Sequence, residues 1–197
     1  MESIEPTTII TQQKPFRMIQ HEFQEQVDKF IELNNKEMQR IYMVQKGLAP
    51  QVTLLLYNNE TKQFGVFPTV LPGGLLGSEQ DKDMLAYKVL PELIAKANDS
   101  GFQVICLSWS TEAWIREAPI APTATITPDD IPKNWKDLPK SEAIMISYET
   151  PLKSLLFTWK IMRKKDGIQL EPHGYPQEMK SLGGRFQGIL NKQSGLN

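Results

Sequence analysis

The residues best suited to chemistry follow a single apolar run at residues 104–107. Ser108, Ser110 and Glu112 come next at alternate positions, so a strand that continues through them would place the three side chains on one face. A serine near a carboxylate occurs in hydrolases, but neither serine stands in a G-x-S-x-G turn and both histidines are distant in sequence. Hydrogen bonding between the hydroxyl groups and the carboxylate is therefore the simpler interpretation.

Glu112 and Arg116 are the candidate catalytic residues if the chain is an enzyme. They are four positions apart and would form an ion pair if this segment were helical. In an enzyme, Glu112 would act as a general acid or base and Arg116 would hold an anion. No complete catalytic constellation accompanies them, so the sequence favours a structural ion pair and a protein without enzymatic activity.

Trp114 lies between these two charged residues, at the predicted end of the strand. Because an indole can bury about 150 to 250 Å², we expect it to pack against the proline-rich segment that follows. Its expected partners there are Pro119, Pro122 and Trp135. The alternative is an exposed contact face, and the candidate binding residues are then Glu112, Trp114, Arg116 and Trp135.

The sequence contains no metal or cofactor signature. His21 and His173 have no partner at metal-ligand spacing, and a single cysteine cannot form the usual zinc sites. Residues 71–78 contain three glycines before a predicted helix, as phosphate-binding loops do, but neither of the familiar glycine motifs is present. We therefore expect no metal and no cofactor.

A basic run near the end of the last predicted strand offers a different function. The run follows aromatic residues that could stack on bases, which is one way in which proteins bind single-stranded nucleic acid. More often such a run is the solvated end of a hairpin. Nucleic-acid binding is therefore an alternative prediction, resting on Lys160, Arg163, Lys164 and Lys165.

Composition and charge indicate an ordinary globular protein. The 197 residues suit a single domain, and the formal net charge of −1 provides no general attraction to nucleic acid or anionic lipid. The lone Cys106 stands inside the apolar run, which predicts a buried thiol and a reducing compartment, the cytoplasm. Neither a signal peptide nor a run of about 18 apolar residues is present, so we expect no membrane association.

Two long helices are predicted. Apolar residues at steps of three and four indicate the first at residues 18–47, ending in a left-handed Gly47. Asn34 and Asn35 interrupt its apolar face and mark either a bend or a polar contact. The second helix covers residues 78–97, begins with a capping box formed by Ser78 and Asp81, and should be kinked by the proline at position 91.

Five strands are predicted, at residues 52–57, 64–70, 102–110, 143–149 and 154–162. The first two and the last two form hairpins, each flanking the central strand that starts at residue 102. Pro68 lacks a backbone N–H, so the second strand should lie at a sheet edge or end there.

The whole chain is accordingly predicted to be an α+β protein. We expect a flexible N-terminal arm at residues 1–15 and one globular domain at residues 16–197, with a proline-rich loop at residues 117–140 and a weak terminal helix at residues 177–190. The domain should hold about five strands in a mixed or antiparallel sheet, with both long helices packed on one face.

The segment from residue 52 to residue 116 resembles a group of uncharacterised small α+β proteins encoded by bacteria and their phages. The resemblance rests on a strand pair, a helix and a strand that ends in Glu112-Ala113-Trp114. It implies a bacterial or phage origin and carries no activity.

The sequence favours a non-enzymatic binding or accessory protein. Two unusual loops, at residues 71–76 and 117–140, are the expected contact surfaces for a protein partner or for self-association. The alternatives are a small hydrolase or nucleotide-handling enzyme that uses Glu112 and Arg116, and a protein that binds nucleic acid through the basic run.

Overall fold

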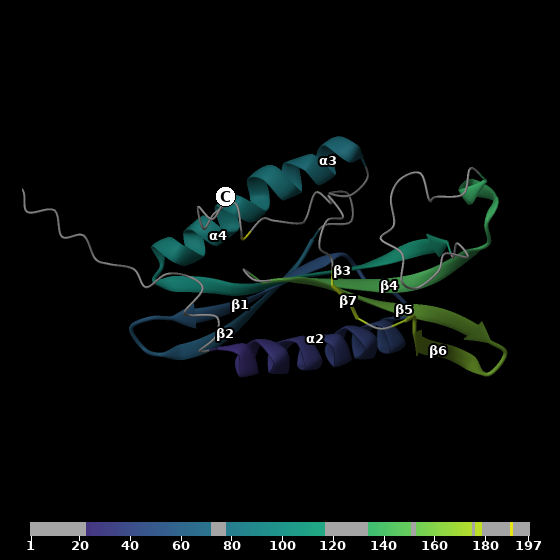
Figure 1. Cartoon of the computed structure of the whole chain (residues 1–197), viewed down its shortest axis with the longest axis horizontal. Coiled ribbons are helices and arrows are strands. Elements are labelled where there is room, and N and C mark those ends of the chain that lie inside the picture. The colour runs from purple at the N-terminus through teal and green to yellow at the C-terminus, as the bar shows by residue number, and fades with distance from the viewer. Residues whose placement is uncertain are drawn as a thin grey trace, which may run out of the picture.

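One antiparallel sheet lies between two helical segments (Figure 1). The computed structural model describes residues 23–71, 78–116, 134–150, 153–174, 176–178 and 190. The strands are β1 (Gln51–Asn58), β2 (Gln63–Val70), β3 (Phe102–Arg116), β4 (Lys140–Glu149), β5 (Ser154–Lys164), β6 (Gly167–Pro172) and β7 (Gln177–Glu178). The helices are α2 (Gln24–Gln45), α3 (Glu79–Met84), the π turn η2 (Leu85–Val89), α4 (Leu90–Asp99) and the 3-10 turn η4 (Trp135–Asp137).

The strand order is β2-β1-β3-β4-β5-β6, with the two-residue β7 also paired to β5. Every described pairing is antiparallel, which confirms the α+β class and the antiparallel form of the sheet. Both predicted hairpins are present, β1–β2 and β4–β5, and they flank β3 as expected. The prediction that Pro68 stands on an edge strand is also confirmed, because β2 ends the sheet.

The prediction missed β6 and β7. β6 is short and most of its residues are exposed. Only Ile168 and Leu170 alternate with exposed residues and pack on the core, and two apolar positions are too few to identify a strand from the sequence. The predicted helix at residues 177–190 begins instead as strand β7, and of its remaining residues only the helical Leu190 is described. The arm at residues 1–15 and most of the loop at residues 117–140 lie outside the described residues.

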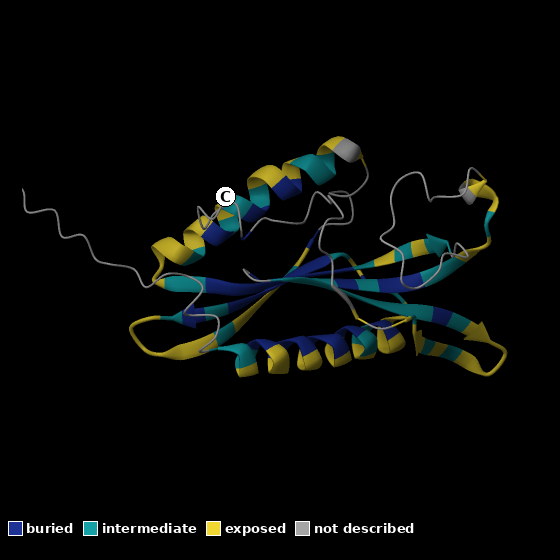
Figure 2. Ribbon diagram, viewed as in Figure 1, coloured by how far each residue is buried: buried dark blue, intermediate teal, exposed yellow. Residues whose placement is uncertain are grey.

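α2 is amphipathic over its 22 residues and packs its apolar side on the sheet (Figure 2). Val27, Ile31 and Met38 are buried against the strands, which confirms the predicted apolar face. The left-handed residue after the helix is Lys46, with φ 59°, rather than the Gly47 that we expected. Its backbone N–H bonds to the carbonyl oxygen of Tyr42, which closes the last turn one residue early.

The second helical segment starts as predicted and is disturbed near its proline. The Ser78 hydroxyl accepts a hydrogen bond from the Asp81 N–H, and the Asp81 carboxylate accepts one from the Ser78 N–H, so the capping box is confirmed. Pro91 cannot donate to the helical ladder. The disturbance takes the form of the π turn η2 between α3 and α4, directly before the proline.

The two helical segments cover opposite faces of the sheet, so the prediction that both pack on one face is wrong (Figure 1). One core gathers α2 with residues from β1, β3, β4 and β5, and the other gathers η2 and α4 with residues of β1 and β3. The reason is that β1 and β3 carry apolar side chains on both faces instead of alternating between apolar and polar residues. Each face of the sheet therefore needs a helix to shield it from water.

A β-bulge in β3 adjusts this alternation. Leu55 pairs with Cys106 and Leu56 pairs with Val104, so Ile105 has no partner in β1. As a result Ile105 and Cys106 both belong to the α2 core, whereas Val104 belongs to the α4 core. The run of consecutive apolar residues is thus divided between two cores by one extra residue.

β3 and β4 extend beyond the rest of the sheet as a two-stranded ribbon. The pairing of β1 with β3 ends where Gln51 meets Ser110, but β4 stays paired with β3 as far as Arg116. Among the described strands, residues 111–116 therefore have a neighbour on one side only. α2 ends near the same point, because the chain passes from Gln45 through a short turn into β1.

Burial of Cys106 and Tyr148 predicts a loss of stability at high pH. Burial raises the pKa of both groups, and the nearby Glu149 carboxylate raises the pKa of Cys106 further. Each group keeps its proton when folded and releases it when unfolded, so stability is complete below the unfolded pKa values and declines above pH about 9 for the thiol and about 10 for the phenol.

Urea unfolding of the parent and of Cys106→Ala between pH 7 and 10.5 tests this expectation. The parent should lose stability steeply above pH about 9, and the variant should lose it less steeply. A thiol reagent should react with Cys106 only after the protein has been denatured, because the side chain is fully buried in the folded state. Rapid labelling at neutral pH would contradict this placement.

Candidate functional site

Trp114 is exposed on the β3–β4 ribbon, so the expectation that it is buried is wrong. Its relative exposure is 64%, high for so large an aromatic side chain. Trp114 stands on the same face of β3 as Ser108, Ser110 and Glu112, which is the face covered by α2. Glu112 already meets the turn that follows α2, so Trp114, two residues further along, lies past the end of the helix.

A small hollow opens beside this tryptophan. Its lining residues come from three adjacent strands: Glu112, Ala113 and Trp114 from β3, Glu142 from β4, and Arg163 from β5. Trp114 and Glu142 are cross-strand partners, with Cβ atoms expected about 4.5 to 5.5 Å apart. The strand register therefore assembles this site from residues that are distant in the sequence.

Glu112 holds the connection between α2 and β1. Its Oε1 accepts a hydrogen bond from the Leu48 backbone N–H, at 2.5 Å. The hydroxyl-to-carboxylate bonding predicted from the sequence is absent among the described residues, since Ser108 bonds elsewhere and Ser110 has no described hydrogen-bond partner. Glu112 thus fixes the position of the turn beside the hollow while it contributes negative charge to that hollow.

Arg163 is held by Glu142 at the other side of the hollow. Its Nε and a terminal nitrogen both contact Oε2 of Glu142, at 2.8 and 2.7 Å, and a terminal nitrogen lies 3.5 Å from the Tyr42 hydroxyl. The hydrogen bond to Glu142 raises the pKa of Arg163, so the guanidinium stays charged. Burial is the main reason that the pKa of Tyr42 is raised, with Glu112 and Glu142 adding to the rise and Arg163 opposing it.

Arg116 does not form the helical pair that we expected with Glu112. The segment is a strand, in which residues four apart are separated by about 13 Å. The Arg116 guanidinium instead donates a hydrogen bond to the Leu138 carbonyl, next to the start of β4. Trp135 lies in the turn η4 before Leu138, and its side chain is not among those described.

His173, the histidine that the structure describes, is not among the residues that line the hollow. His173 follows β6 and its backbone N–H bonds to the Thr158 carbonyl, whereas His21 lies outside the described residues. Within the described ranges, no three His, Cys, Asp or Glu side chains lie close enough together to hold a metal ion. The hollow measures about 130 Å³, well below the roughly 300 to 1,000 Å³ of pockets that enclose small molecules. Its size suits the end of one side chain.

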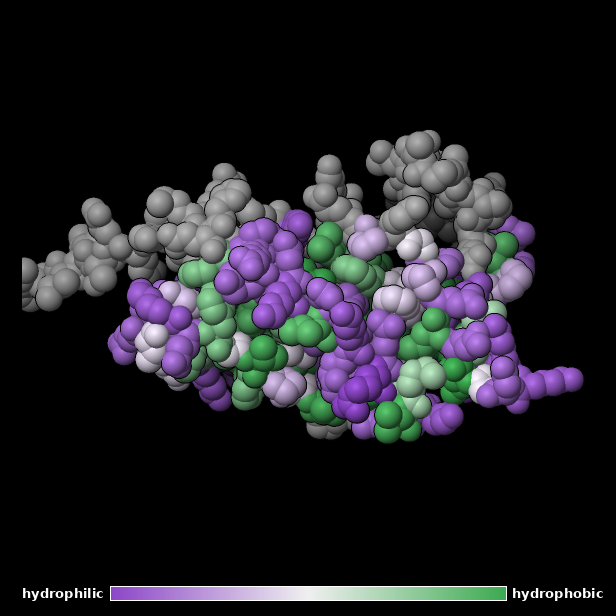
Figure 3. All heavy atoms as spheres, turned by 90° about the horizontal axis from the view of Figure 1, so that it is seen from below, coloured by the Kyte–Doolittle hydropathy of each residue, from purple (hydrophilic) through white to green (hydrophobic). Residues whose placement is uncertain are grey.

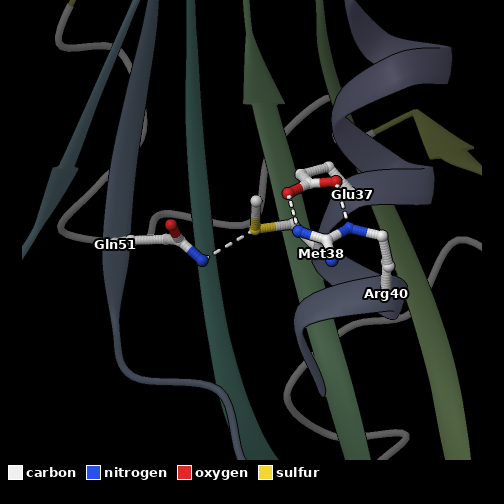
Figure 4. A network of polar contacts seen from close by, with 4 residues as sticks. All are labelled: Glu37, Met38, Arg40 and Gln51. Carbon is white, nitrogen blue, oxygen red and sulfur yellow. Dashed lines mark hydrogen bonds and ion pairs between the residues drawn. The ribbon is translucent and has the colours of Figure 1, made fainter. Parts of the chain in front are cut away.

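Ser108 belongs to a buried polar layer under α2. The Asn34 amide donates hydrogen bonds to the Ser108 hydroxyl, at 2.9 Å, and to the Tyr148 hydroxyl, at 3.1 Å. Nearby, the Gln51 amide points at the Met38 sulfur, while the Glu37–Arg40 pair remains on the outer side of the helix (Figure 4). The sequence left two interpretations of Asn34, a bend in the helix or a polar contact, and the polar contact is therefore correct.

The four residues of the basic run, three in β5 and one after it, do not form a single surface. Alternation along the strand places Arg163 on the α2 face and Lys160 and Lys164 on the other, with Lys165 in the turn that follows. Lys164 contacts Gln169 and Glu171 on β6. Within the described part of the chain, these four residues thus do not lie on one face, although a groove for a nucleic-acid backbone is usually lined by basic residues along its length.

Sequence reasoning missed Glu142 and Arg163 as site residues. Glu142 precedes an apolar run and carries no motif, and Arg163 was assigned to the basic run. Only the register of β3, β4 and β5 brings them to Trp114. A cross-strand pairing rule applied to the correct register would have found Glu142, but the sequence does not specify that register.

No described helix combines the length and apolar character needed to cross a lipid bilayer. Comparison of the chain with protein-family models, with curated proteins and with solved structures yields no match. The bacterial or phage resemblance thus remains a prediction.

Substitution of Trp114 should leave the stability of the fold nearly unchanged. We expect Trp114→Ala to melt within about two degrees of the parent, because exposed side chains contribute little to the free energy of unfolding. Trp109→Ala is the matched control, since Trp109 is 7% exposed on the same strand and should cost about 3 to 5 kcal/mol. Thermal unfolding followed by circular dichroism measures both, and equal losses would contradict this assignment.

Asn34 should matter more than other asparagines on helices. Asn34→Ala removes the donor that serves two buried hydroxyl groups, so we expect a loss of about 2 to 3 kcal/mol. Asn98→Ala, at an exposed position of α4, should change stability by less than about 0.5 kcal/mol. Urea titration distinguishes the two, and a neutral Asn34→Ala would show that the polar layer contributes nothing.

Proposed function

We propose that the chain is a non-enzymatic binding or accessory protein that engages a protein partner through the β3–β4 ribbon. The observation that carries the proposal is the exposure of Trp114 on paired strands. Tryptophan is among the residues that most often dominate the binding energy of protein interfaces. Its position on a strand, and not on a free loop, lowers the conformational entropy that a complex would otherwise lose.

The rest of the described surface offers less for a partner of this kind. Seen from the α2 side in Figure 3, hydrophobic residues form separate small groups among hydrophilic ones. β2 exposes Val66 and Val70 beside Pro68, but a proline on an edge strand interrupts the hydrogen bonds that a further strand would form. The ribbon is the stronger candidate because one large side chain stands beside fixed charges.

The two loops predicted as contact surfaces are described only in part, and one of them lies next to the ribbon. In the turn at residues 71–76 only Leu71 is described, and it is buried. In the loop at residues 117–140 the described part is residues 134–140, which leads directly into β4 and so adjoins the ribbon. We keep both segments as expected secondary contacts.

The enzymatic alternative has less support. Glu112 accepts a backbone hydrogen bond and Arg116 donates one, so each candidate catalytic group already has a positioning role. Nucleic-acid binding through residues 160–165 likewise stays an untested prediction. A shift assay at two salt concentrations tests it, since affinity for phosphates must fall steeply with salt.

Affinity capture tests the proposed function. Tagged parent protein, incubated with a lysate of the organism that encodes it or with untagged copies of itself, should retain a stoichiometric partner. Trp114→Ala should lose this partner, whereas Tyr87→Ala should keep it. Tyr87 is the matched control because it is an aromatic residue of similar exposure, 60%, in η2 on the other side of the sheet. A partner retained equally by both variants would refute the ribbon as the contact face.

A further inference from the structure

We infer that the hollow beside Trp114 receives one basic side chain, an arginine or a lysine, from the partner. This inference rests on the proposed function and adds the chemistry that the site recognises. Within the hollow, the carboxylates of Glu112 and Glu142 face a single guanidinium, that of Arg163. The lining therefore keeps an excess of one negative charge, which complements a cation.

The hydrogen bonds leave an acceptor on each carboxylate. Oε1 of Glu112 accepts the Leu48 N–H, and both contacts from Arg163 reach Oε2 of Glu142. Oε2 of Glu112 and Oε1 of Glu142 receive no hydrogen bond from the described part of the chain. These two oxygens come from adjacent strands and can accept the several N–H donors of a guanidinium or an ammonium group.

The end of α2 lies near the hollow but adds no unopposed negative charge. The last turn of α2 contains no basic residue, and its terminal carbonyl groups carry a partial negative charge, but the C-cap residue that follows them is the cationic Lys46. The turn after this helix contacts the hollow through Leu48 and Glu112. The attraction for a positive group here therefore comes from the two carboxylates, Glu112 and Glu142.

Trp114 supplies an aromatic ring on which the cation can stack. An indole is the aromatic side chain that attracts cations most strongly, through the electron-rich face of the ring. Because Trp114 is largely exposed, a flat guanidinium can approach that face without displacing protein atoms. The volume of about 130 Å³ accommodates one side-chain end but not a whole small molecule.

Short peptides test this inference directly on the whole chain. The probes are acetyl-Gly-Arg-Gly-amide, its lysine analogue and its citrulline analogue, which keeps the shape of arginine without the charge. The readout is the indole N–H resonance of Trp114 in an NMR titration, assigned by its absence in Trp114→Phe. We expect the two basic peptides to shift it with a Kd of about 1 to 10 mM at low salt, in the range of a single weak contact.

The citrulline peptide should bind at least about fivefold more weakly, and added salt should weaken the arginine peptide. A double variant, Glu112→Gln with Glu142→Gln, should also lose about fivefold in affinity, because the amides keep the shape and remove the charge. Glu171→Gln is the control for charge removal elsewhere, on β6, and should bind like the parent. Melting curves show that the variants are folded.

Equal binding of the arginine and citrulline peptides by the parent overturns the inference, and so does the absence of any shift with the basic peptides. These outcomes need no variant. If capture of the partner depends on Trp114 while the basic peptides do not bind, this inference fails and the proposed function stands. If no partner depends on Trp114, the proposed function fails and this inference fails with it.

Discussion

β3 is the constraint on which the rest of the structure depends, because a single strand must serve two hydrophobic cores. Seven consecutive residues, 104–110, are buried, so neither face of β3 tolerates water. α2 covers one face and the segment from α3 to α4 covers the other. Because of the bulge, Ile105 packs in the α2 core as an extra apolar residue. This is the larger of the two cores, since α2 packs there with residues of four strands.

The functional features follow from a mismatch of lengths. β3 continues to Arg116 and keeps β4 as its partner, whereas β1 and α2 stop near the level of Ser110 and Glu112. Beyond that level no helix of the described residues covers the α2 face of the sheet, and Trp114 is exposed although it is among the largest apolar side chains in the chain. The same extension aligns Glu142 with the indole and makes the hollow.

The interface between α2 and the sheet buries polar groups, which lowers stability, as well as apolar groups, which raise it. Asn34, Ser108 and Tyr148 satisfy one another through hydrogen bonds, but the buried Ser110 hydroxyl receives no partner from the described residues. Burying an unpaired hydroxyl costs about 1 to 3 kcal/mol. The buried apolar residues around this layer, such as Ile31, Ile146 and Met38, supply the opposing stabilisation.

Local signals in the sequence predicted local structure well. The spacing of Val27, Ile31 and Met38 identified α2, the pair Ser78 and Asp81 identified the start of α3, and the alternation in β5 identified its core face. Features set by long-range pairing were not predictable. The placement of helices on opposite faces, the exposure of Trp114 and the meeting of Glu142 with Arg163 all depend on register.

Paired strands, and not a loop, hold Trp114 away from the core. Hydrogen–deuterium exchange of residues 111–116 tests this placement most directly. Because β4 is paired with every one of these residues, alternate amides should exchange far more slowly than those of an unstructured peptide, although the Trp114 side chain is exposed. Exchange of all six amides at unprotected rates would contradict the account, since Trp114 would then lie on a segment without stable pairing.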